Sequence, residues 1–112
     1  MAVTPVQLIA PKIAENSQHT QYTSTGLTTI IDKFTATNYG AAAAALSVNL
    51  VTLADTAGNN NLVVKAKMLQ AGETYTFPEV VGHILGVGGF ISTLADTATS
   101  ISIMADGRQV TS

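Results

Sequence analysis

Residues 27–38 read LTTIIDKFTATN, a segment rich in threonine and isoleucine. Ile30, Phe34 and Ala36 share one parity along it, and Asp32 interrupts that parity. Alternation with a period of two, carried by β-branched and aromatic residues, is typical of a half-buried β-strand. The tripeptide 38–40 (Asn-Tyr-Gly) favours a turn directly afterwards. The segment therefore predicts a long strand that ends at a turn.

The same signals recur along the rest of the chain. Alanines fill residues 41–45 and favour helix by intrinsic propensity, but the clean alternation that follows them favours a strand. Residues 78–85 predict a helical turn or an irregular loop. Further strands are expected at residues 3–10, 19–24, 43–53, 62–69, 74–77, 90–94 and 100–110. On the strand at 62–69 we expect Leu62, Val64, Ala66 and Met68 to face inward and Lys65 and Lys67 outward, and on the last strand we expect Ile101 and Ile103 to face inward.

About eight short strands separated by turn residues favour an all-β domain, a small β-sandwich or barrel. A chain of 112 residues is expected to form one domain, here residues 19–112 preceded by an extended N-terminal arm at residues 1–18. Prolines in the arm suit an extended segment or an edge strand, but not a central strand. The arm is predicted either to reach a neighbouring subunit or to fold back as an edge strand. In the first case the partner-binding residues would be Val3, Val6, Leu8 and Ile9.

The composition is unusually poor in charge. Only 11% of the residues are charged while 46% are hydrophobic, whereas about 25% charged residues is typical of globular domains. A surface with few charges does little to keep copies apart, so we expect partners to cover much of it. Serine, threonine and asparagine side chains that solvate the surface are the simpler alternative.

Charge and composition also argue against several partners. The net charge is −2 and the five basic residues are scattered, so no stripe is available to neutralise a nucleic-acid backbone. The chain has no cysteine, which rules out disulfides and thiolate metal sites. No apolar run is long enough to span a membrane, and the N-terminus does not resemble a signal peptide. We therefore expect synthesis in a cytoplasm, followed by incorporation into something larger.

The residues able to carry chemistry form no strong motif. Glu79 and His83 would share a helix face if their segment were helical, but two ligands do not make a zinc site. No serine lies in a Gly-x-Ser-x-Gly elbow, so a catalytic triad is not indicated. We expect no enzyme activity, no metal, no cofactor and no small-molecule substrate.

Three loop and strand features are explained by structure without a ligand. Residues 55–61 carry one Asp and three Asn, but their spacing does not match a calcium-binding loop, so a turn is expected. Residues 86–89 (Gly-Val-Gly-Gly) lack the lysine of a phosphate-binding loop and predict a tight turn. Lys65 and Lys67 are expected on a solvated face, or alternatively in salt bridges to a neighbouring subunit.

Six segments stand out together: Tyr22–Thr23, Thr28–Phe34, Thr37–Asn38, Ala71–Tyr75, Ile91–Ser92 and Gly107–Arg108. Together they resemble a family of small all-β virion structural proteins of tailed bacteriophages. The resemblance covers roughly residues 19 to 110, and its motifs are turn-and-strand patterns. The chain departs from the family pattern at Gly89, where Asp is usual, and at Asp106, where Ser is frequent.

The resemblance implies a capsid decoration, or cement, protein. Such a protein would bind the outer capsid surface, contact the major capsid protein and other copies of itself in a homotrimer, and stabilise the shell. It would be assembled in the host cytoplasm and located on the capsid exterior. A neck, collar or tail-fibre module is the alternative within the virion. A carbohydrate-binding module is a third hypothesis, although such sites usually present exposed aromatics and the three tyrosines Tyr22, Tyr39 and Tyr75 are widely spaced.

Overall fold

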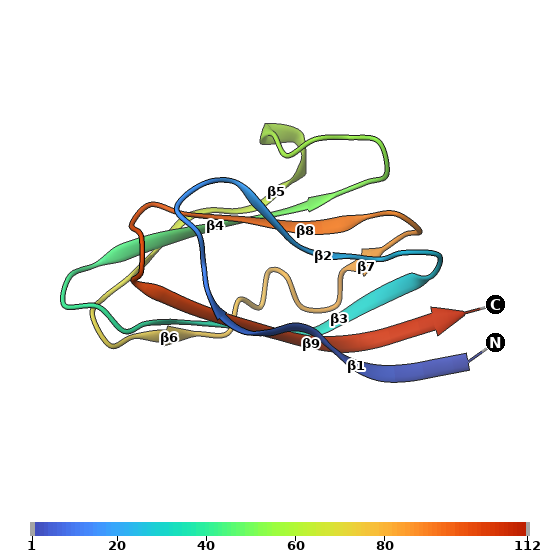
Figure 1. Ribbon diagram of the computed structural model, residues 1–112, viewed down its shortest axis with the longest axis horizontal. Coiled ribbons are helices and arrows are strands. Elements are labelled where there is room, and N and C mark those ends of the chain that lie inside the picture. The colour runs from blue at the N-terminus through green and yellow to red at the C-terminus, as the bar shows by residue number, and fades with distance from the viewer. Residues whose placement is uncertain (1, 112) are drawn as a thin grey trace.

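The computed structural model describes residues 2–111, which form two antiparallel sheets packed face to face (Figure 1). One sheet has five strands in the order β1–β9–β3–β6, with β7 also pairing with β3, and the other has four in the order β2–β8–β4–β5. The predicted all-β sandwich is therefore confirmed. Its strands are β1 (Ala2–Ile13), β2 (His19–Thr23), β3 (Thr28–Asn38), β4 (Ala44–Val51), β5 (Leu62–Leu69), β6 (Thr74–Tyr75), β7 (Ile84–Leu85), β8 (Phe90–Ala95) and β9 (Ile101–Thr111), and a short 3-10 helix, η1 (Asn59–Asn61), precedes β5.

The core lies between the two sheets and draws side chains from both. Ile101 and Ile103 of β9 are fully buried, as the alternation predicted. Phe34 of β3 meets Phe77 edge to face, with ring centroids 5.2 Å apart. Each large apolar side chain buried in this way stabilises the fold by about 1.5–3 kcal/mol. No helix within residues 2–111 is long and apolar enough to cross a membrane.

A β-bulge explains why Asp32 interrupts the pattern of β3. The register with β9 shifts between Ile31 and Lys33, so the buried parity changes there. Ile31 is fully buried before the bulge and Phe34 after it, while Ile30 is only half-buried. Ile30 and Phe34 share one parity in the sequence but differ in burial, because the extra residue re-aims the strand.

The bulge also sets the contacts of its neighbours on β9. It leaves Asp32 on the surface, where its carboxylate accepts hydrogen bonds from Nε and Nη2 of Arg108 at 2.9–3.2 Å. Gly107 pairs with Ile31, and a Cβ on Gly107 would lie 2.3 Å from the carbonyl oxygen of Ile30. Only glycine therefore fits at this position of β9.

A second irregularity corrects the prediction for β5. Its register with β4 shifts between the pairs formed by Lys67 and Val64, and Ala66 has a φ of 49°. Ala66 and Met68 are consequently exposed, although the alternation placed them inward. Leu69 is fully buried instead, and Val64 is half-buried. Bulges of this kind are common on edge strands, where they disrupt the ladder available to another chain.

Two local ambiguities are resolved by packing. Of the five alanines at residues 41–45, only Ala44 and Ala45 lie in β4, where they are nearly fully buried between neighbouring strands, while residues 41–43 belong to the exposed turn before it. Residues 84–85 form the short strand β7, which pairs with Thr29 and Ile30 of β3. The prediction of a helical turn or an irregular loop at residues 78–85 therefore did not include the two-residue strand β7.

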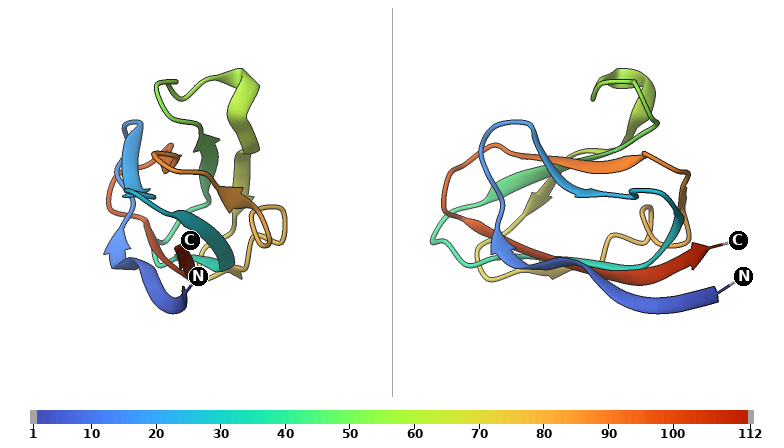
Figure 2. Two further views of the ribbon diagram at one scale, coloured as in Figure 1. Left: turned by 90° about the vertical axis from the view of Figure 1, so that its right-hand side faces the viewer. Right: turned by 45° about the vertical axis from the view of Figure 1, so that its right-hand side comes forward.

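The N-terminal segment lies along its own domain as an edge strand. β1 pairs antiparallel with β9 from Ala2 opposite Thr111 to Ile13 opposite Ser102, with two register shifts. The two termini consequently lie side by side at one end of the sandwich, as both views in Figure 2 show. The edge position accommodates Pro5 and Pro11, which could not donate to a second neighbouring strand.

At the opposite end, Asn38 joins three turns. Its side-chain amide donates to the carbonyl oxygens of Ala42 (2.8 Å) and Leu69 (3.0 Å). Its side-chain oxygen accepts from the Gly40 amide (2.9 Å) and from the hydroxyl of Ser100 (3.0 Å). The side chain is fully buried with both polar atoms satisfied, so this end of the sandwich is closed by hydrogen bonds.

Candidate functional site

The end of the sandwich at which β7 lies exposes three large apolar side chains, which we call the apolar end. Leu53 follows β4, Ile84 is in β7, and Val87 is in the turn before β8. Their exposed fractions are 68%, 64% and 55%, respectively. Single exposed hydrophobic residues are ordinary, but clustered ones mark surfaces that bind other molecules. The apolar end is the strongest candidate functional surface of the described chain.

Two hollows flank Ile84 on this surface. The first, of about 260 Å³, is lined by Val51, Leu53 and Val87 among others. The second, of about 370 Å³, is lined by residues that include Asp55 and His83. Leu50, Thr52 and Ile84 line both hollows, so the exposed Ile84 side chain stands between them.

Glycines shape the turn beside the first hollow. Gly88 has a φ of 81°, which favours glycine, and its amide donates to the carbonyl oxygen of Ser24 at 2.7 Å. A Cβ on Gly88 would lie 2.5 Å from Cδ1 of Leu53, so the Leu53 side chain rests directly against this glycine. The tight turn predicted at residues 86–89 is thus confirmed, and it provides a surface on which Leu53 packs.

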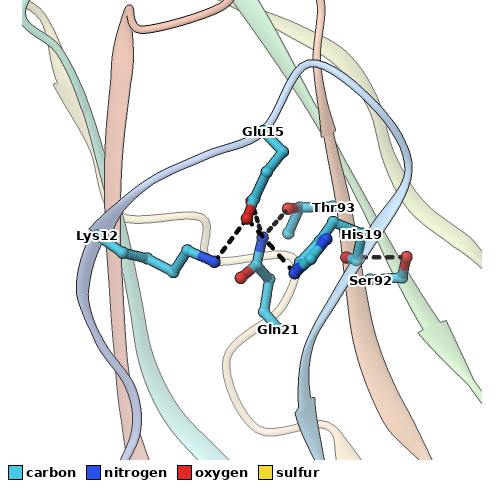
Figure 3. A network of polar contacts seen from close by, with 6 residues as sticks. All are labelled: Lys12, Glu15, His19, Gln21, Ser92 and Thr93. Carbon is cyan, nitrogen blue, oxygen red and sulfur yellow. Dashed lines mark hydrogen bonds and ion pairs between the residues drawn. The ribbon is translucent and has the colours of Figure 1, made fainter.

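A polar network surrounds the segment that links β1 to β2, residues 14–18 (Figure 3). Glu15 accepts a hydrogen bond from Nζ of Lys12 at 2.8 Å and another from the amide of Gln21 at 2.8 Å. Nε2 of His19 lies 3.4 Å from the same carboxylate. Gln21 also donates to the Thr93 hydroxyl at 2.9 Å, which attaches the network to β8.

The environment of Glu15 favours its charged form. Partial burial alone would raise its pKa, but hydrogen bonds from Lys12 and Gln21 and the positive charge of Lys12 outweigh this effect and lower the pKa to about 2. The network therefore holds a carboxylate that is ionised at neutral pH, and its contacts stabilise the link between β1 and β2.

The contact between Ser92 and His19 does not have the geometry of a nucleophile and its base. The Ser92 hydroxyl donates to the main-chain carbonyl oxygen of His19 at 3.2 Å, as Figure 3 shows, and not to the imidazole. An activated serine would place its hydroxyl on an imidazole nitrogen. This arrangement serves to hold β2 against β8.

The side chains that could bind a metal ion lie apart from one another or already accept hydrogen bonds within the protein. Among residues 2–111 no three His, Cys, Asp or Glu side chains gather as a metal site would require. Glu79 accepts hydrogen bonds from the Tyr75 hydroxyl at 2.8 and 3.1 Å. The segment that carries Glu79 and His83 is not helical, so these two residues do not share a helix face.

The loop at residues 55–61 uses its side-chain oxygens within the protein. Oδ1 of Asn61 accepts hydrogen bonds from the Asn49 side chain (2.7 Å) and from the Gly58 amide (3.0 Å). Asp55 accepts from the Thr56 amide at 2.8 Å. These hydrogen bonds attach the loop to β4, and they explain its asparagine and aspartate residues without a bound metal ion.

Lys67 and Lys65 differ in their surroundings. Nζ of Lys67 lies 4.5 Å from the ring centroid of Tyr75, a cation–π contact within the domain. Lys65 is exposed and lines a hollow of about 200 Å³ on the four-stranded sheet. A salt bridge from Lys65 to a neighbouring subunit stays a prediction.

The structure divides the four residues expected on the N-terminal arm. Val3 is exposed and Val6 is half-buried. Leu8 and Ile9 are buried in the core of this chain. Exposed residues therefore occur at both ends of β1, Val3 and Ile13 among them, whereas Leu8 and Ile9 in its middle join the core.

The tyrosines are not arranged as an aromatic platform. The Tyr22 hydroxyl contacts Thr29 at 2.7 Å and accepts from Gln109 at 3.0 Å, and the Tyr75 ring packs against Phe77. Tyr39 is half exposed at the Asn38 end. The three side chains therefore serve different parts of the domain.

Comparison with known protein families, characterised proteins and solved structures finds no match to this chain. The residues that sequence reasoning missed are those of the apolar end. Leu53, Ile84 and Val87 come from three separate segments with no common periodicity, so only the folded structure brings them together.

Proposed function

We propose that this protein is a structural component of a bacteriophage virion, a capsid decoration protein that binds the outer surface of the shell and stabilises it. The observation that carries the proposal is the apolar end, where Leu53, Ile84 and Val87 are more than half exposed around two hollows. A surface of this kind suits adhesion between proteins. The virion setting comes from the family resemblance of the sequence.

Three further properties support an adhesive role. Charged residues make up only 11% of the chain, so little of its surface opposes contact with other proteins. The edge strand β1 carries no charged residue from Ala2 to Pro11, and charges are a usual protection of free strand edges. The core is built from many fully buried side chains and does not include Leu53, Ile84 or Val87, which stay available to a partner.

The mechanism would be stabilisation by preferential binding. A protein that binds the assembled shell and not its separated subunits shifts the equilibrium toward the shell by mass action. The partners are the major capsid protein and further copies of this chain. No bond is made or broken in this mechanism.

Copy number in purified virions tests the proposal. Quantitative mass spectrometry, standardised to the major capsid protein, should find this chain in numbers of the same order as capsid subunits. A very small fraction of that number would favour the neck, collar or tail fibre instead. Absence from purified particles would reject both virion roles.

A further inference from the structure

We infer that the apolar end is a self-association surface, through which two copies of this chain pair about a two-fold axis. The inference deepens the proposed function, and rests on it only in naming one of the partners. Residues 50–55 and 83–87 have the shape, the apolar character and the charge that such a contact requires.

The shape of the surface is self-complementary. Ile84 is 64% exposed and lines the hollows on both of its sides. A two-fold contact requires that one patch supply both the protruding group and the depression that receives it. Ile84 of each copy can enter a hollow of the other, where Leu53 and Val87 surround it.

The charges of the surface also permit two identical copies to meet. The first hollow is lined by no ionisable side chain. The second is lined by Asp55 and His83 and by no lysine or arginine. A two-fold axis near Ile84 allows Asp55 of one copy to face His83 of the other, so the pairing involves no contact between like charges. In that position the Asp55 carboxylate can accept a hydrogen bond from the His83 imidazole, and polar complementarity of this type sets the register of an interface.

Sheet geometry leaves the same region open to a second chain. β7 is an edge segment of the five-stranded sheet and pairs only with β3 among the described strands. Unlike β5, it carries no lysine. No lysine side chain therefore opposes the approach of a second chain at this two-residue strand, where the apolar side chains gather.

Sedimentation velocity of the purified full-length chain over a concentration series provides the test. We expect a reversible dimer, and we expect Ile84→Ser to weaken its association constant at least about a hundredfold, since each dimer buries this side chain twice. Leu53→Ser is a second variant on a separate segment, and it should weaken association as well. Ile13→Ser is the matched control, because Ile13 is 47% exposed on β1 but pairs with Ser102 at the opposite end.

Circular dichroism and thermal unfolding establish that each variant is folded. If Ile84→Ser does not fold, Leu53→Ser carries the test. A wild-type chain that is monomeric or trimeric throughout would overturn the inference, as would a dimer that persists in the folded variants of the apolar end. Because the experiment uses purified protein alone, its failure is distinct from absence of the chain from virions, which would overturn the proposed function.

Discussion

The two ends of the sandwich are built in opposite ways. At one end, Asn38 is fully buried and connects three turns through four hydrogen bonds. At the other end, Leu53, Ile84 and Val87 are exposed around two hollows. The first end contributes to the stability of the isolated chain, whereas the second leaves apolar surface whose burial requires another molecule. Substitutions at the two ends should therefore have different consequences.

The largest effect is expected at the closed end. Asn38→Ala would leave the carbonyl oxygens of Ala42 and Leu69 and the Ser100 hydroxyl without their partner in a buried setting. We expect the free energy of unfolding to fall by about 3 kcal/mol. Chemical denaturation measures this loss. Asn60→Ala, at an exposed position, should change stability by less than about 0.5 kcal/mol; equal losses in both variants would remove the special role of Asn38.

A smaller loss is expected where the turn supports the apolar end. Gly88→Ala places a side chain at a φ of 81° and pushes Leu53 away. We expect a loss of about 2 kcal/mol, from backbone strain and displaced packing. Gly86→Ala is the control, since nothing lies near its Cβ position and its φ is not in the positive region. Equal stability of the two variants in thermal unfolding would show that the packing of Leu53 on Gly88 contributes nothing.

The polar network on the β1–β2 link should make the free energy of unfolding depend on pH, an effect not expected from Asn38 or from the apolar end. Because folding lowers the pKa of Glu15 from 4.5 to about 2, its contribution is complete above pH 4.5 and is lost as the pH falls toward 2. Allowing for a side chain that is one-third exposed, we expect Glu15→Gln to cost about 1 kcal/mol at pH 7 and almost nothing near pH 2. Denaturant titrations at several pH values would show whether the stabilities of the wild type and of Glu15→Gln approach each other as the pH falls. A difference in stability that stays constant with pH would contradict the prediction.

The smallest effect on monomer stability is expected at the apolar end itself. Ile84→Ser replaces a side chain that is mostly in water, so the free energy of unfolding of the monomer should change by less than about 0.5 kcal/mol. Denaturation at a concentration low enough to separate any dimer measures this value. A loss as large as that of Asn38→Ala would show that Ile84 serves the fold and not a partner.

The sequence predicted the strands well because their signal is local. Alternation located β2, β3, β4, β5, β8 and β9 to within a few residues, and the buried Ile101 and Ile103 followed from it. The bulges in β3 and β5 were not predicted, because an extra residue is recognised only against its partner strand. Asp32 was nevertheless visible as an irregularity in an otherwise regular pattern.

The candidate surfaces could not be predicted in the same way. The apolar end combines side chains from three segments, and β7 is too short to show a period. In the polar network, only the spacing of Lys12, Glu15 and His19 was visible in the sequence, since Gln21 and Thr93 meet by strand pairing. Leu8 and Ile9 looked like residues for a partner because nothing local shows that β1 folds back onto β9.

Reconstitution of phage particles tests the central claim most directly. Particles made without this chain would be mixed with the purified protein, and the temperature at which they release DNA would be measured with and without it. We expect the protein to bind the shell and to raise the release temperature, as a ligand of the assembled state must. Particles that bind none of it, or that bind it and release DNA at an unchanged temperature, would contradict a role in stabilising the capsid.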